Sequence, residues 1–75
     1  MKDPYPLIQS LYTSLGISDD SAKKENLNAQ ILWHSTNNRK TYYESALAAY
    51  DLYKEGQSYQ QIVVSLSLIS RPIEG

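Results

Sequence analysis

The sequence predicts an all-α fold, a small antiparallel bundle of three to four short helices in a single domain that spans residues 1–75. The first observation is a pair of capping boxes, in which a Ser or Thr and a Glu or Gln three residues later cap each other's backbone amides. TYYE at Thr41 and SYQQ at Ser58 both fit this pattern. The second is Gly56 between them, a residue type that commonly ends a helix. The third is the recurrence of apolar residues at spacings of three and four, the period of one helix face.

The first predicted helix begins near Pro6, which suits a first turn because its missing amide hydrogen would have no helical partner there. Gly16 is expected to adopt a left-handed conformation after the helix. Ile17 can then fold back onto Tyr12 as the apolar contact of a Schellman motif. One face of this helix is apolar and comprises Leu7, Ile8, Leu11, Tyr12 and Leu15.

The second predicted helix runs from the Ser and Asp capping candidates at 18–21 to about His34. It carries two apolar stripes, one made of Leu27, Ile31 and His34 and the other of Ala22, Ala29 and Trp33. A helix with one solvent-exposed face needs only one apolar stripe, which packs against the core. We therefore expect this helix either to lie at the centre of the bundle or to present one stripe to another molecule.

The third predicted helix spans roughly residues 42–55, after a predicted loop at 35–38 that is rich in Ser, Thr and Asn. Its apolar arc is broad, with Tyr42, Ala49 and Tyr53 on one flank and Tyr43, Leu47 and Tyr50 on the other. Acidic residues at positions 44, 51 and 55 mark the side that is expected to face solvent.

The segment 59–70 fits either a helix or a strand. A helix would place Tyr59, Ile62, Val63, Leu66 and Ile69 on one face, whereas a strand would alternate Ile62, Val64, Leu66 and Leu68 with Val63, Ser65 and Ser67. The helix is favoured, because a capping box precedes the segment and a lone strand would have no partner elsewhere in the chain. Arg71-Pro72 is expected to end it. The predicted core of the bundle consists of Leu7, Leu11, Leu15, Leu27, Ile31, Leu47, Tyr50, Ile62 and Leu66.

Composition excludes several kinds of site. The absence of cysteine excludes disulfides, thiolate metal sites and a cysteine nucleophile, and a single histidine excludes a multi-histidine metal site. Seven basic and eight acidic side chains give a net charge of −1. A protein that neutralises several phosphates normally has a basic stripe, so nucleic-acid binding is not favoured. The sequence contains no apolar run typical of a signal peptide or a membrane-spanning helix, so we expect a cytoplasmic protein that binds no membrane.

His34 is the first candidate for acid–base chemistry, because its ordinary pKa lies near neutrality. No Asp or Glu lies one helical turn away to orient its ring. We therefore expect a structural histidine, partly buried near a helix C-terminus, where a positive charge is favourable. Asp19 and Asp20 lack the alternating ligands and the glycine of a calcium loop, and they are expected to cap a helix. The sequence predicts no catalytic residue, no metal site and no cofactor.

Tyrosine is the most informative aromatic residue in the chain. There are seven tyrosines and no phenylalanine, together with Trp33. A tyrosine ring buries apolar surface while its hydroxyl needs water or a partner, which suits interfaces. The alternative is a small domain with little interior, whose rings are half-exposed of necessity. We predict an interaction surface for another protein or a second copy of the chain, made of Trp33, Tyr42, Ala49 and Tyr53.

Short segments resemble two known families. The sequence YKEGQSYQQI at Tyr53 resembles the start of the helix-turn-helix in resolvase-like DNA-binding domains. The turn glycine of that family is replaced around Ser67, and the chain stops before a recognition helix could form. LGIS at Leu15 also resembles a helix-turn-helix turn, but aspartates follow at 19–20, where such proteins contact phosphates. The segment 43–59 is similar to one tetratricopeptide-type unit, whereas stacked repeats need about three.

These observations favour a non-enzymatic protein–protein interaction module that acts through a tyrosine-bearing helical face. It would be a small regulator or accessory factor, for example in transcription or secretion. The surplus of apolar stripes on the second and third helices motivates this hypothesis. The alternative is a weak helix-turn-helix-like nucleic-acid-binding protein, a dimer that pools Lys23, Lys24, Arg39 and Lys40.

Overall fold

The computed structural model of the chain describes residues 3–69 and contains four α-helices in this range. They are α1 (Pro4–Leu15), α2 (Ser21–Asn37), α3 (Tyr42–Lys54) and α4 (Tyr59–Ile69), and no strand occurs between residues 3 and 69. The predicted all-α bundle is confirmed, and the ambiguous last segment is a helix. The predicted end of that segment at Arg71-Pro72 lies outside the described residues, as does the side chain of Ile69.

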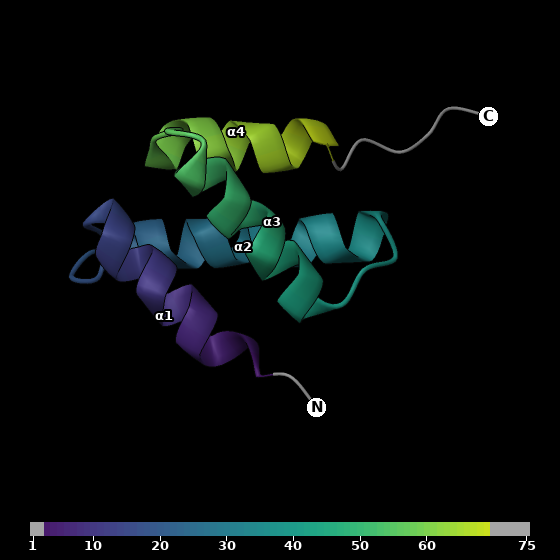
Figure 1. The fold of residues 1–75 in the computed structure, drawn as a ribbon, viewed down its shortest axis with the longest axis horizontal. Helices are drawn as coiled ribbons and strands as arrows, with labels where there is room; N and C mark the ends of the chain where they lie inside the picture. Colours follow the sequence, from purple (N-terminus) through teal and green to yellow (C-terminus); the bar gives the residue numbers. More distant parts are fainter. Residues whose placement is uncertain (1–2, 70–75) are drawn as a thin grey trace.

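α2 and α3 are the central helices of the bundle, and α1 and α4 pack against them. Figure 1 shows α3 crossing α2, while α2 and α4 lie side by side and run in the same direction. This parallel pair arises because α3 returns the chain between them. α1 packs against α3, and α3 packs against α1, α2 and α4. Each helix therefore has at least one side against another helix and one side toward solvent.

The first helix begins and ends as its local sequence requires. Asp3 caps α1 by accepting a hydrogen bond from the amide of Tyr5 at 3.0 Å, so the helix begins at Pro4, two residues before the predicted start. At the other end, Gly16 has a φ of 72°. The amide of the next residue, Ile17, donates to the carbonyl of Tyr12 at 3.0 Å, and the Ile17 side chain is buried. The predicted Schellman motif is confirmed.

The second helix is one turn longer than predicted. Residues 35–37 continue the helix and Asn38 caps it, and three side chains of this stretch donate back to carbonyls of the last turns. Ser35 donates to Leu32 at 2.8 Å, Asn37 to Trp33 at 2.9 Å, and Asn38 to His34 at 2.9 Å. The chain reverses only at Arg39, which has a φ of 54°. Side-chain hydrogen bonds to the backbone normally compete with a helix, but at this position they are made within the C-terminal end of α2.

Both predicted capping boxes are present. The hydroxyl of Thr41 accepts from the amide of Glu44 at 3.0 Å, and the Glu44 carboxylate accepts from the amide of Thr41 at 2.9 Å. Ser58 and Gln61 form the same reciprocal pair at the start of α4, at 3.3 and 2.9 Å. The direction of the chain into α3 and α4 is therefore fixed by local hydrogen bonds.

Replacement of Thr41 by Ala is expected to lower the free energy of unfolding by about 0.5–2 kcal/mol, because the amide of Glu44 loses its acceptor. Urea denaturation measures this change. Thr36→Ala is the matched control, because Thr36 is exposed inside α2, where Ala is the better helix former. This control should be as stable as the parent protein or slightly more stable. Equal destabilisation by both substitutions would contradict a capping role.

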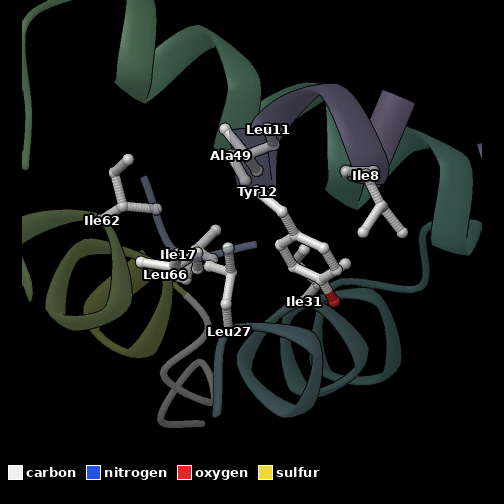
Figure 2. Close-up of a cluster of buried hydrophobic side chains, with 10 residues drawn as sticks. Ile8, Leu11, Tyr12, Ile17, Leu27, Ile31, Ala49, Ile62 and Leu66 are labelled. Carbon is white, nitrogen blue, oxygen red and sulfur yellow. The ribbon is translucent and has the colours of Figure 1, made fainter. Parts of the chain in front are cut away.

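The hydrophobic core lies between the facing sides of all four helices (Figure 2). Among the described residues it comprises ten buried apolar side chains: Ile8, Leu11, Tyr12, Ile17, Leu27, Ile31, Ala46, Ala49, Ile62 and Leu66. Five of the predicted core residues are among them. Leu7, Leu15 and Tyr50, which were also predicted, are half-buried and pack against its edge.

The prediction was wrong for Leu47, whose side chain is 38 % exposed. α3 contributes Ala46 and Ala49 to the core instead, and Ser45 beside them is also fully buried. α3 contacts the other three helices, and small side chains on its inward face allow their axes to approach closely. Leu47 lies on the flank that this close packing leaves in solvent.

Candidate functional site

The predicted interaction surface does not form one continuous face. Ala49 is fully buried in the core, so it is not available to a partner, and that part of the prediction was wrong. Tyr42 and Tyr53 of α3 are half-buried and pack against the core. Trp33 of α2 is 48 % exposed. Of the four residues, Trp33 is the one that presents a largely free side chain to solvent.

Tyr42 joins α3 to α2, and Tyr12 joins α1 to α2. The Tyr42 hydroxyl donates a hydrogen bond to the side-chain carbonyl of Asn28, and the Tyr12 hydroxyl donates to the backbone carbonyl of Lys24 at 3.3 Å. Burial raises the pKa of both phenols. Repulsion from the negative charge of a neighbouring phenolate raises it further, from Tyr12 and Tyr5 at Tyr42 and from Tyr5 at Tyr12. Both phenols therefore remain protonated, as hydrogen-bond donors, at physiological pH.

These two rings and Tyr5 line an open groove of about 430 Å³ where α1, α2 and the start of α3 meet. Its remaining lining residues are Ile8, Gln9, Ser21, Lys24, Glu25 and Asn28. An aromatic groove of this size with polar groups at its rim is typical of a small-molecule site. The Lys24 ammonium, however, already lies 5.9 Å from the centroid of the Tyr12 ring. The polar groups of Tyr12, Tyr42 and Lys24 are thus engaged in contacts that connect the helices.

Other tyrosines also connect neighbouring parts of the chain. Tyr50 and Tyr53 meet edge to face, with ring centroids 5.9 Å apart. The Tyr59 hydroxyl accepts a hydrogen bond from the side-chain amide of Asn26 at 2.9 Å, and the Lys23 ammonium lies 5.5 Å from its ring centroid. Tyr12, Tyr42 and Tyr59 thus each form a hydrogen bond to α2 through the hydroxyl, whereas the Tyr50–Tyr53 contact lies within α3.

The outer face of α2 is the apolar surface that these contacts leave open. It is defined here as Ala22, Ala29, Leu32 and Trp33, all of which are exposed. The other stripe of α2, made of Leu27, Ile31 and His34, is buried against the bundle. Leu32 is 46 % exposed and was missed from the sequence, although it lies three residues after Ala29, a spacing that places both on one face. α2 is thus central to the bundle and also keeps a second apolar stripe in solvent.

The two basic pairs lie at opposite ends of α2. Lys23 and Lys24 are in its first turn, while Arg39 and Lys40 follow its last residue. The helix has 17 residues, which at 1.5 Å per residue corresponds to roughly 25 Å. Within one chain these side chains therefore do not gather into a single phosphate-binding patch.

His34 is buried, with 2 % of its surface exposed, and its Nδ1 lies 2.8 Å from the hydroxyl of Ser45 on α3. Burial lowers the pKa of His34, and the positive charge of Lys40 lowers it further. Burial and the charge of Lys40 therefore disfavour the protonated ring, contrary to the expectation that a positive charge is favourable here. In this conformation the ring joins α2 to α3 and has no contact with a solvent-borne substrate.

Asp20 caps α2 by accepting from the amide of Lys23 at 3.0 Å, which confirms its predicted capping role. Within residues 3–69 no three potential metal-ligating side chains come together, and no helix has the length and apolarity needed to cross a bilayer. The chain matches no protein-family model, no curated protein and no solved structure.

Proposed function

We propose that the chain is a non-enzymatic protein-interaction module that binds another protein through the α2 outer face. The observation that carries this proposal is the half-exposed Trp33 next to the half-exposed Leu32, on the side of a central helix turned away from the core. Tryptophan is one of the residue types enriched among those that dominate protein-binding energies. It contributes a large apolar surface at a small cost in conformational entropy.

The spacing along α2 indicates how a partner would bind. Ala22, Ala29 and Leu32 follow one another at intervals of seven and three residues, the pattern of a helix that lies in an apolar groove. The two alanines allow a close approach of the partner, and Trp33 and Leu32 supply the bulky anchors.

Charge favours a partner other than a second copy of the chain. Glu25 is exposed on the same side, between Ala22 and Ala29. A groove with a Lys or Arg at its edge would complement this carboxylate. In a symmetric pair formed through this face, the two Glu25 side chains would carry like charges within one interface, which is unfavourable.

Replacement of Trp33 by Ser is expected to weaken partner binding at least about tenfold while the helical circular dichroism and the melting temperature stay close to those of the parent protein. Tyr5→Ser is the matched control, because Tyr5 is an exposed aromatic residue on α1, outside the α2 outer face. Proteins from the source cell that are retained by the parent and the control, but lost with Trp33→Ser, are then purified and titrated.

The titration has an internal reporter, because Trp33 is the single tryptophan of the chain. A partner that encloses the ring should shift its fluorescence to shorter wavelength. Equal retention of every bound protein by the parent, Trp33→Ser and Tyr5→Ser would contradict the proposed surface.

A further inference from the structure

The outer side of α4 carries a second apolar surface that the proposed function does not use. Val64 is 55 % exposed and Leu68, one helical turn later, is 59 % exposed. On the opposite side of the same helix, Ile62 and Leu66 are fully buried against the bundle. A helix that is apolar on both sides normally has both sides covered.

A hollow adjoins this surface at the start of α4. It has a volume of about 380 Å³, is open to solvent, and is lined by Gln57, Gln60, Gln61, Val64 and Ser65. The Ser65 hydroxyl donates to the side-chain carbonyl of Gln57 at 2.8 Å, which fixes one wall. Val64 forms part of the wall of the hollow, and the exposed Leu68 lies one turn after Val64.

The charge pattern indicates what covers this surface. No charged side chain occurs from position 56 to position 70, so α4 is uncharged along its whole length. In a two-fold symmetric contact each residue near the axis meets its own copy, and like charges there would repel. An uncharged helix satisfies this requirement, and a net charge of −1 for the whole chain adds little repulsion between two molecules.

We propose that α4 pairs with α4 of a second copy of this chain, antiparallel, about a two-fold axis beside Val64. Gln60 and Leu68 are each four residues from Val64, so this axis places Leu68 of each molecule opposite Gln60 of the other. Each Leu68 side chain then enters the hollow of the other molecule, and the two Val64 side chains meet at the centre. The contact closes on itself and produces a dimer, not a filament.

This surface lies on a different helix from the α2 outer face, so the dimer and the proposed partner binding are tested independently. The dimer would present two α2 outer faces, one from each molecule. A partner with two copies of its groove would then bind more tightly than a single contact allows.

The test is the molar mass of the untagged protein, measured by light scattering or sedimentation equilibrium from micromolar to millimolar concentration. The chain is expected to change from its monomer mass of 8.5 kDa toward twice that value as concentration rises. Leu68→Glu should weaken dimerisation at least about tenfold, because it places an uncompensated charge in each apolar contact. Leu47→Glu is the matched control on an exposed leucine of α3 and should dimerise like the parent.

A charge pair tests the antiparallel register. Gln60→Lys mixed with Leu68→Glu should restore association, since each mixed dimer brings one new lysine opposite one new glutamate. If Leu68→Glu fails to fold, Val64→Ser replaces it, because Val64 is exposed and lies at the proposed axis.

A parent protein that remains monomeric at millimolar concentration would overturn the proposal. A dimer that survives both Leu68→Glu and Val64→Ser would also overturn it. If such a dimer were dissociated by Trp33→Ser, the α2 outer face would be the self-association surface, and the proposal of a different protein as its partner would fail as well.

Discussion

Replacement of Leu27 by Ala is expected to lower the free energy of unfolding by about 2–5 kcal/mol. Leu27 is fully buried on the inward stripe of α2, within the cluster that also contains Ile31 and Leu66 (Figure 2). The substitution removes apolar contacts and leaves a cavity that neighbouring helices fill only in part. A chain of 75 residues has a total stability of roughly 4–11 kcal/mol at typical values per residue. The expected loss is therefore a large share of the whole.

Thermal and urea unfolding, followed by circular dichroism, measure this effect. Leu32→Ala is the control, because it removes the same atoms from an exposed position on the same helix. The control should change the free energy of unfolding by about 0.5 kcal/mol or less. If the two variants were equally stable, α2 would not face the core through the stripe that contains Leu27.

The helix ends could be predicted from the sequence because each depends on residues only three to five positions apart. Both capping boxes and the Schellman motif after α1 occur where the pattern indicated them. The end of α2 is the exception. Its Ser and Asn side chains can stabilise a loop or satisfy the last helical carbonyls, and the residue types alone do not decide between the two.

Which side of each helix faces inward could be predicted only in part. Periodicity predicts two apolar flanks for α3, and it places Leu47 on one of them as a core residue. The crossing of α3 with three other helices selects Ala46 and Ala49 instead, and that crossing is a long-range property. Periodicity alone does not show which flank of α3 is covered by other helices, and this is why the sequence placed Ala49 on an interaction surface.

The ambiguity of the last segment has a structural origin. Alternating apolar residues suggested a strand, yet the segment is a helix whose two sides are both apolar. Ile62 and Leu66 account for the buried side, while Val64 and Leu68 account for the exposed one. The feature that made the secondary structure hard to predict is thus the same feature that motivates pairing between two copies of α4.

The sequence could predict that α2 has a surplus of apolar surface, because it places two apolar stripes on this helix. It could not predict which of the two stripes would be exposed. Which stripe is exposed follows from the fact that α3 and α4 both pack on the side of Leu27 and Ile31. The tyrosine contacts were also out of reach, since Tyr12 and Tyr42 use partners on α2 that are 12 and 14 positions away in the chain.

Lowering the pH below about 6.5, the ordinary pKa of histidine, is expected to destabilise the fold through His34. Burial lowers the pKa of His34 in the folded protein, and the charge of Lys40 acts in the same direction. Between the unfolded-state and folded-state pKa values, the unfolded chain binds more protons than the folded chain. The stability contributed by the neutral ring is therefore complete above about 6.5 and is lost as the pH falls through the folded-state pKa.

Glu44 titrates in a separate and lower range. The amide of Thr41 holds the pKa of the exposed Glu44 carboxyl below its ordinary value of about 4.3. Its stabilising effect is present above that value and is lost as the pH falls through the lowered pKa. A loss of stability between pH 7 and pH 5 thus reports on His34, and a further loss below about pH 4.3 includes Glu44.

The single histidine makes the measurement direct, because one imidazole signal in the NMR spectrum of the untagged protein belongs to His34. Its titration midpoint is expected below about 6.5, and Lys40→Gln should raise it by removing a nearby positive charge. The melting temperature of the parent should fall between pH 7 and pH 5, while that of His34→Gln should stay nearly constant over this range. A midpoint at or above about 6.5, or the same pH dependence in both proteins, would show that the ring is free to take up its proton in the folded state. The loss of stability with acid would then have to be assigned to carboxylates such as Glu44. Protonation of His34 in the folded state would cost no stability, despite its burial and its hydrogen bond to Ser45.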